Sequence, residues 1–341
     1  MNIPATSTLE RLLIQWSDEL TARALLGQVA VPEALRAERG EIVPRAVIAQ
    51  ALNLALFHGL LARVPAARER VGEVTRAGRR VQFDHGALRT VISAGGALPS
   101  GYRAFSRILE PLGYRVANTY PLPRIHMTGR AYCHEDLPEE IAQFFVSEIA
   151  LDGFSEDFQA AAARVVATVR DLLSSGAADL LERLAHTGAL QFREAAALLP
   201  ALVLCFDRPY AAPALADYRT LLRESAEMAW IATEGNLFNH VTERVSDIVA
   251  VAEEQKRHGR PMKEAIEVSR SGRVRQTAYF AASIAREFVA PDGPIVTQNV
   301  PGSFYEFIQR ERFTDESGKS RLDLAFDSSN AQGIFKMTTA A

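Results

Sequence analysis

One short motif occurs twice in the sequence, and this duplication limits the possible folds more than any other feature. Residues 83–89 read FDHGALR and residues 238–244 read FNHVTER. Each copy carries Phe, then Asp or Asn, then His, with an Arg four positions after the His. Matched fragments at matched places of a larger repeat indicate a duplicated structural unit. The elements that follow the two copies should therefore correspond.

The first copy opens a predicted strand–helix–strand–strand–strand unit. Residues 81–91 combine β-branched and aromatic side chains without a helical period, which is typical of a strand. Residues 99–113 predict a helix, because Pro99 stands near its start and Gly113 just past its end. Three extended segments follow, separated by proline and charged turns, over 114–123, 125–134 and 141–150.

The second copy opens the same order of elements. Residues 236–245 predict a strand. Residues 246–259 predict a helix that Ser246 or Asp247 caps and that Gly259 ends. Two extended segments and a closing strand complete the unit, over 263–272, 275–289 and 302–313.

The two units predict an α+β fold in which duplicated βαβββ units form one cupped mixed sheet. Between them, Ala- and Leu-rich helices are expected over 158–185, 192–204 and 214–230, and we interpret them as a packing cap without chemistry. The expected order is an N-terminal helical segment, the first unit, a helical insertion, and the second unit with a C-terminal tail, all within one compact catalytic domain. The corresponding ranges are 1–75, 76–150, 151–225 and 226–341.

The composition argues against several classes of protein. With 341 residues, 48% of them hydrophobic, the chain can bury a large core. A net charge of −3 does not indicate a polyanion-binding surface, so no nucleic-acid partner is expected. No apolar run reaches about 18 residues and the N-terminus does not resemble a signal peptide, so no membrane partner is expected. Cys133 and Cys205 have no metal or redox spacing, which favours a reducing, cytoplasmic setting.

The histidines of the two motifs are candidate metal ligands. Side chains four apart on a strand share a face, so His85 points the same way as Arg89, and His240 the same way as Arg244. If the units pair about a twofold axis, the opening strands lie side by side and the histidines converge. Glu306, on the closing strand of the second unit, is the best third ligand by position. Two histidines and one carboxylate leave room on iron for a bidentate substrate and dioxygen.

Each of these residues also has a simpler interpretation. A histidine on a strand is more often held by hydrogen bonds for structural reasons. Glu306 could lie at the surface or pair with Arg310, which shares its face of the strand. Arg89 could pair with an acid elsewhere, although its planar fork suits a substrate carboxylate better than a lysine would. His126 and His134 lie in a polar strand and turn and are interpreted as residues outside the ligand set.

Several stretches together resemble the DUF1338 family, which includes the 2-oxoadipate dioxygenase/decarboxylases, also called hydroxyglutarate synthases. These stretches occur in order over residues 75–340 and read FDHGALRT, HMTGRAY, PEEIAQFFVSE, FNHVTERV, PGSFYEFIQR and NAQGIFKMT. The resemblance implies a fold similar to the vicinal oxygen chelate fold. It also implies an Fe(II) site whose ligands are His85, His240 and Glu306.

The same resemblance implies the roles of further residues and the reaction. Arg89 would be the catalytic, substrate-binding arginine, and the C-terminal segment with Ser329 and Asn330 would lie beside the substrate. The implied reaction converts 2-oxoadipate, or a similar 2-oxo dicarboxylic acid, and O2 to 2-hydroxyglutarate and CO2, as a step of lysine breakdown.

Two other functions stay open at this point. The same scaffold could carry a metal-dependent isomerase of the glyoxalase or epimerase type, in which the metal only polarises oxygen atoms. It could also be a non-enzymatic protein whose sheet binds a small acid. The sequence leaves open the exact 2-oxo acid, the metal used in the cell, the stereochemistry of the product and the oligomeric state.

Overall fold

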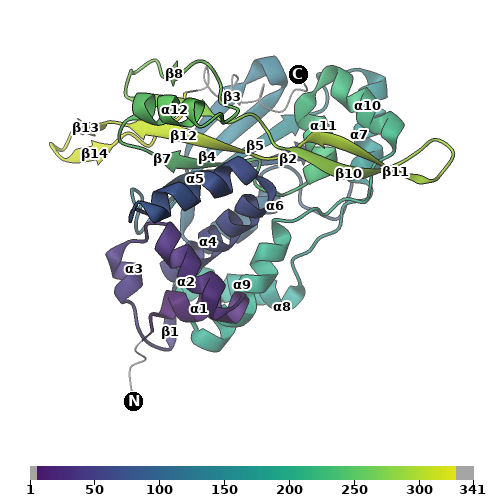
Figure 1. Ribbon diagram of the computed structural model, residues 1–341. Helices are drawn as coiled ribbons and strands as arrows, with labels where there is room; N and C mark the ends of the chain where they lie inside the picture. Colours follow the sequence, from purple (N-terminus) through teal and green to yellow (C-terminus); the bar gives the residue numbers. More distant parts are fainter. Residues whose placement is uncertain (1–5, 328–341) are drawn as a thin grey trace.

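A curled, eight-stranded mixed sheet lies at the centre of the computed structural model, which describes residues 6–327 (Figure 1). The first four strands in spatial order come from the first predicted unit and the other four from the second. In this order they are β3 (Tyr114–Leu122), β4 (Met127–His134), β5 (Gln143–Ala150), β2 (Gln82–Ile92), β7 (His240–Arg244), β12 (Phe304–Arg310), β9 (Val274–Ala278) and β8 (Glu267–Val268).

The pairing of the strands relates the two units by an approximate twofold axis. At the centre, β2 and β7 run antiparallel, with His85 opposite Thr242 and Ala87 opposite His240. Outside them, β5 runs parallel to β2 and β12 runs parallel to β7. The two remaining strands of each unit add to the sheet in antiparallel order. The predicted duplication and the predicted α+β fold are therefore confirmed.

One crossover helix belongs to each unit, as the sequence predicts. The helices are α6 (Arg103–Leu109), after β2, and α12 (Ile248–Arg257), after β7. Of the two predicted caps of α12, the structure uses Asp247, whose side chain accepts a hydrogen bond from the backbone N–H of Ala250 at 3.0 Å.

The second unit departs from the prediction between β9 and β12. The predicted single extended segment over 275–289 is wrong, because β9 ends at Ala278 and the chain then forms a separate hairpin. Its strands are β10 (Ser283–Val289) and β11 (Ile295–Pro301), joined by a turn in which Gly293 has a positive φ of 97°. The hairpin packs against the insertion instead, where the buried Phe288 lies on Tyr218, with ring centroids 4.8 Å apart.

Helices of the N-terminal segment cover one face of the sheet (Figure 1). Phe57 from this layer packs on Phe83 of β2, with ring centroids 5.4 Å apart. The elements of this layer are α1 (Thr8–Trp16), α2 (Glu19–Gln28), α3 (Glu33–Ala37), β1 (Ile42–Pro44), α4 (Arg45–Arg63), α5 (Pro65–Arg76), α8 (Ser175–Thr187), β6 (Ala189–Gln191) and α9 (Phe192–Cys205).

The helix α4 is long and strongly apolar. Within residues 6–327 it is the one helix whose length and apolar composition would allow it to cross a membrane. However, 78% of its most apolar stretch is buried inside the protein, and core helices share these properties.

Within the insertion, α8, β6 and α9 pack with the N-terminal helices, and the other helices pack at one end of the sheet, beside the hairpin (Figure 1). The predicted continuous helix over 158–185 is wrong. Its first part ends at Val166, and a new helix begins after Ser174, whose hydroxyl accepts from the N–H of Ala177 at 3.3 Å. The remaining elements are α7 (Glu156–Val166), α10 (Leu215–Glu224), α11 (Ala226–Glu234), the short helix η1 (Pro123–Ile125), and the hairpin of β13 (Arg312–Thr314) and β14 (Ser320–Leu322). The proposed division of the chain into four segments stays a prediction.

Candidate metal centre

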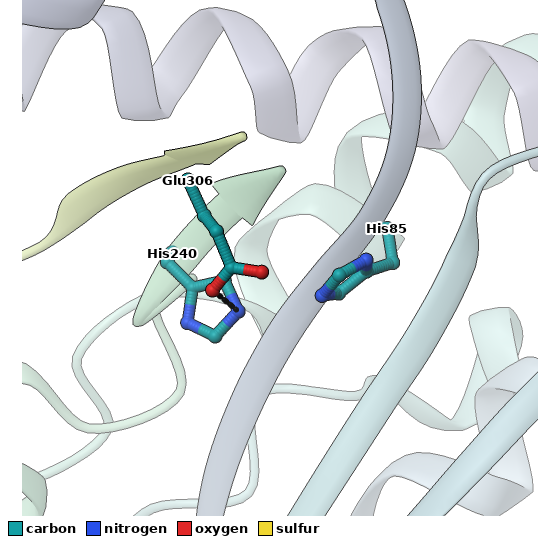
Figure 2. A group of neighbouring side chains, drawn as sticks. All are labelled: His85, His240 and Glu306. Atoms are coloured by element: carbon teal, nitrogen blue, oxygen red, sulfur yellow. Dashed lines mark ion pairs between the residues drawn. The ribbon is translucent and has the colours of Figure 1, made fainter. Parts of the chain in front are cut away.

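The structure brings His85, His240 and Glu306 together (Figure 2). One potential ligand atom of each side chain lies within 4.8 Å of those of the other two. The side chains come from β2, β7 and β12, and they are 2%, 5% and 1% exposed. In residues 6–327, this is the one group of three or more His, Cys, Asp or Glu side chains close enough to share an ion.

The register of three neighbouring strands causes this convergence. His85 on β2 lies opposite Thr242 on β7, and Thr242 lies opposite Glu306 on β12. His240 lies two residues before Thr242, so its side chain points to the same face of the sheet. His85 and Glu306 are thus aligned across the three strands, His240 is their neighbour on the same face, and the three side chains converge.

A β-bulge at Asp84 fixes the orientation of His85. The strand pairing between β2 and β7 shifts between Phe83 and His85, so Asp84 is an extra residue and its side chain stays beside the neighbouring histidine. Asp84 Oδ1 lies 2.8 Å from His85 Nδ1. The ionised carboxylate can only accept, so Nδ1–H donates, and Nε2 of His85 accepts from the Thr242 hydroxyl at 3.1 Å. His85 thus presents an unprotonated Nε2, which is the form that binds metals.

His240 also presents an unprotonated Nε2. Its Nδ1 lies 3.3 Å from Asn239 Oδ1, the counterpart of Asp84 in the second motif. Its Nε2 has no hydrogen-bond partner among the described residues. Burial lowers the pKa of His240 well below its ordinary value, and the nearby His85 and Arg89 lower it further. Burial also lowers the pKa of His85, against the opposing effect of Asp84. Both imidazoles are therefore neutral near pH 7.

Glu306 supplies the negative charge of the group. Neither of its carboxylate oxygens has a hydrogen-bond partner among the described residues, and burial raises the pKa of Glu306 well above its ordinary value. Oε2 lies 3.8 Å from His240 Nε2, and this imidazole is neutral. A buried carboxylate without partners is costly, and a divalent cation between it and two neutral imidazoles would remove that cost. These donors fit a metal such as iron or zinc.

The approximate twofold axis relates the position of Glu306 in the second unit to a position in the first unit, where a fourth metal ligand could lie. Gln143 of β5 lies opposite His85, and Phe304 of β12 lies opposite His240. Two residues further along, Phe145 of the first unit therefore corresponds to Glu306 of the second. A symmetric site would carry two carboxylates, and this protein has an apolar ring at one of the two positions.

Arg89 lines the same pocket as the three candidate ligands. Its guanidinium carbon lies 5.3 Å from the ring centroid of Trp230 on α11. Burial lowers the pKa of Arg89 to about 10, partly opposed by the negative charge of Glu227, so the group stays protonated at neutral pH. The counterpart arginine differs, because Arg244 donates to the backbone oxygen of Glu139 at 2.9 Å and does not line the pocket.

The pocket is small and largely apolar. It holds about 460 Å³ including its open mouth, a volume suited to a small ligand. Phe326 lies at the mouth, with its ring edge-on to His85 at 4.8 Å and 4.7 Å from the ring of Phe145. Further lining residues are Ala87, Leu88, Ser147, Asn239, Gln276 and Asp327.

Several predictions about single residues need correction or stay open. Glu306 is neither at the surface nor paired with Arg310, which binds Asp84 instead. Ser329 and Asn330, the predicted substrate-binding residues of the C-terminal segment, lie outside the described residues. His134 is buried, with Nε2 2.9 Å from the backbone oxygen of Leu112, and is not part of the pocket.

The sequence reasoning also missed contributors to the site. One helix of the predicted packing cap touches a pocket residue, because α11 places Trp230 beside Arg89. Asp84 could have been found, since it directly precedes the histidine within the motif. Phe145 and Phe326 carry no signal of their own, because apolar residues are common on strands and in loops.

Comparisons with known proteins identify the family of this chain. The family model described as 2-oxoadipate dioxygenase/decarboxylase matches residues 28–338, while no curated protein matches the chain. A crystal structure from Ralstonia eutropha JMP134, described as a glyoxalase superfamily protein, is 52% identical, with a TM-score of 0.90 over 94% of this chain and 98% of its own.

Two more distant structures share the fold. Hydroxyglutarate synthase from Oryza sativa, crystallised with 2-oxoadipate, is 20% identical, with a TM-score of 0.65 over 92% of this chain and 95% of its own. The Pseudomonas putida hydroxyglutarate synthase in complex with 2-oxoadipate is 17% identical, with a TM-score of 0.61 over 88% of this chain and 74% of its own. Because the family model spans nearly the whole sequence, the chain belongs to the 2-oxoadipate dioxygenase/decarboxylase family.

Proposed function

We propose that this protein is an Fe(II)-dependent dioxygenase and decarboxylase that converts 2-oxoadipate, or a similar 2-oxo diacid, and O2 to 2-hydroxyglutarate and CO2. The observation that carries the proposal is the group of His85, His240 and Glu306 with Phe145 at the position of a fourth ligand. Three protein ligands on six-coordinate iron leave three positions, enough for two substrate oxygens and O2. The complexes of fold relatives with 2-oxoadipate support the substrate class.

The side chains of the pocket would bind the iron and orient the substrate. Bound iron would supply the redox chemistry that activates O2 and breaks the bond between the carboxylate and keto carbons of the substrate. His85 and His240 would hold the iron through Nε2, and Glu306 would offset one of its two positive charges. Arg89 would bind a substrate carboxylate through two hydrogen bonds and so determine which carbon faces the metal.

Apolar side chains would keep water away from the reacting atoms. Phe304 packs on the ring of His240, with centroids 4.6 Å apart, and Phe145 and Phe326 line the pocket in contact with each other. A low-dielectric wall strengthens the attraction between the Arg89 guanidinium and a substrate carboxylate. It also protects a reactive oxidant from side reactions with solvent.

The proposed reaction is tested by loading the protein with Fe(II) under anaerobic conditions and then adding O2 together with 2-oxoadipate or its shorter and longer homologues. We expect O2 uptake and CO2 release in equal amounts, with 2-hydroxyglutarate as the product. An isomerase would change its substrate without consuming O2, and a binding protein would return the acid unchanged. Absence of O2 uptake by the iron-loaded protein with every 2-oxo acid would contradict the proposal.

The substitution Arg89→Lys tests the substrate contact. Lysine keeps the positive charge and loses the planar fork, so we expect kcat/KM for a 2-oxo diacid to fall by about 100-fold while the Kd for iron stays the same. Anaerobic iron titration and O2 uptake measure the two effects separately. Arg107→Lys is the control, because Arg107 pairs with Asp171 away from the pocket. Unchanged kinetics in Arg89→Lys would rule out the proposed role.

A further inference from the structure

We propose that Arg310 is a positioning residue that connects His85 to the chain at the pocket mouth, so that metal binding and the seating of this chain are coupled. The chain in question is residues 323–327, which we call the mouth segment. The inference rests on the metal site of the proposed function, and it goes beyond the three ligands and Arg89.

Arg310 holds the carboxylate that orients His85. Its Nε lies 3.1 and 3.0 Å from the two oxygens of Asp84, and its Nη2 lies 2.9 Å from Oδ1. The two side chains are 0% and 1% exposed. These contacts hold the Asp84 carboxylate in place, with Oδ1 2.8 Å from His85 Nδ1.

The same guanidinium holds the mouth segment. Its Nη1 donates to the backbone oxygens of Asp323 at 2.9 Å and Ala325 at 2.8 Å, and its carbon lies 5.0 Å from the ring centroid of Phe326. Phe326 in turn packs edge-on against the ring of His85. One buried cation thus contacts both the partner of a candidate metal ligand and the backbone beside that ligand.

The twofold axis indicates that this arrangement is not a requirement of the fold. Asp84 corresponds to Asn239 in the second motif. Gln143 and Phe304 correspond to each other, because each lies opposite the histidine of its own unit. Six residues further along, Arg310 of β12 therefore corresponds to Ile149 of β5. His240 is therefore accompanied by two uncharged residues at these positions. The buried ion pair accompanies only His85, which is the histidine that contacts the mouth segment. Since a buried ion pair adds little net stability, its presence on one side only favours a functional role.

Metal binding and the position of the mouth segment are coupled because Arg310 donates hydrogen bonds both to Asp84 and to the mouth segment. If the mouth segment leaves, Nη1 loses both carbonyl acceptors, and a buried guanidinium that lacks acceptors is costly. Arg310 would then shift, and Asp84 with it. A divalent cation on His85 makes Nδ1–H a stronger donor to Asp84, which stabilises the arrangement that also holds the segment. Each event favours the other, and such coupling is reciprocal.

The substitution Arg310→Lys tests the coupling, with Co(II) as an oxygen-stable probe. Lysine cannot contact Asp84 and both carbonyls together, so we expect the Kd for Co(II) to rise about 10- to 100-fold. Hydrogen–deuterium exchange of the mouth segment should be slowed by Co(II) in the wild-type protein. In the variant, exchange should be faster and should no longer respond to Co(II).

Two further variants keep the test decisive. Arg312→Lys is the matched control, because Arg312 is exposed and bonds Glu139 and Ser320, and it should change neither measurement. If Arg310→Lys does not fold, the double variant Asp84→Asn/Arg310→Ile removes both charges and reproduces the neutral pair of the second unit, and it should show the same two losses.

Two results would overturn the inference: an unchanged Kd for Co(II) in the Arg310 variants, or exchange of the wild-type mouth segment that does not respond to Co(II). Neither measurement involves turnover. An iron-loaded protein that consumes no O2 would refute the proposed reaction and leave the coupling to be decided by the Co(II) experiments.

Discussion

Replacing Glu306 with glutamine should abolish turnover and weaken metal binding by more than about 100-fold, because loss of a direct ligand exceeds the effect of losing a residue that only supports one. At the same time, the metal-free protein should become no less stable. The pKa of Glu306 is raised in the folded protein, so this carboxyl lowers stability progressively as the pH rises above its unfolded pKa. At neutral pH, glutamine of the same shape removes that cost.

Thermal unfolding with and without metal separates the two effects. A free metal concentration of about 100 times Kd should add about 2.7 kcal/mol to the stability of the wild-type protein and nothing to that of Glu306→Gln. Glu41→Gln is a suitable control, because Glu41 is exposed, pairs with Arg11 and does not line the pocket. A Glu306→Gln protein with full iron content and normal turnover would refute the proposed ligand set.

Replacing Phe145 with glutamate should give the opposite combination, tighter metal binding with loss of turnover. Phe145 occupies the place that corresponds to Glu306 across the twofold axis, so a carboxylate there can become a fourth protein ligand. Four protein ligands leave two positions on six-coordinate iron, and a 2-oxo acid uses both. We therefore expect O2 uptake to fall by more than about 100-fold, since activation of O2 requires a position on the metal.

Phe145→Gln is the matched control for this experiment. Glutamine has the shape of glutamate without its charge, so it should neither tighten metal binding nor block the position for O2. An enzyme that uses the metal only to polarise its substrate would keep its activity in Phe145→Glu. Normal O2 uptake in this variant, with metal bound more tightly, would contradict the idea that an open position on iron is essential.

The sequence predicted the larger part of the fold because the repeat is visible in local signals. Strand periodicity, helix caps and glycine stops identify the elements of each unit, and the repeated motif relates the units to each other. The hairpin of β10 and β11 could not be predicted in the same way. Residues 275–289 are uniformly compatible with a strand, and the packing of Phe288 against Tyr218 joins positions far apart in the sequence.

The candidate site shows a similar division. His85 and His240 could be predicted from the motif, and Glu306 from its place in the repeat. The partner of Arg310 could not be predicted, because Asp84 lies far away in the sequence and reaches Arg310 through a β-bulge. The alternation of side chains alone would have turned Asp84 away from the pocket. Pairings of this kind depend on strand register, which no local sequence signal specifies.

The position of the candidate ligands at the junction of β2 and β7 has a consequence for folding. The ligands are contributed by both halves of the sheet, and long stretches of chain separate them in sequence. An ion bound there would act as a cross-link that closes loops of great length, and closing long loops removes much of the freedom of an unfolded chain. Metal supply in the cell would then determine how much of this protein survives proteolysis, as well as how much of it is active.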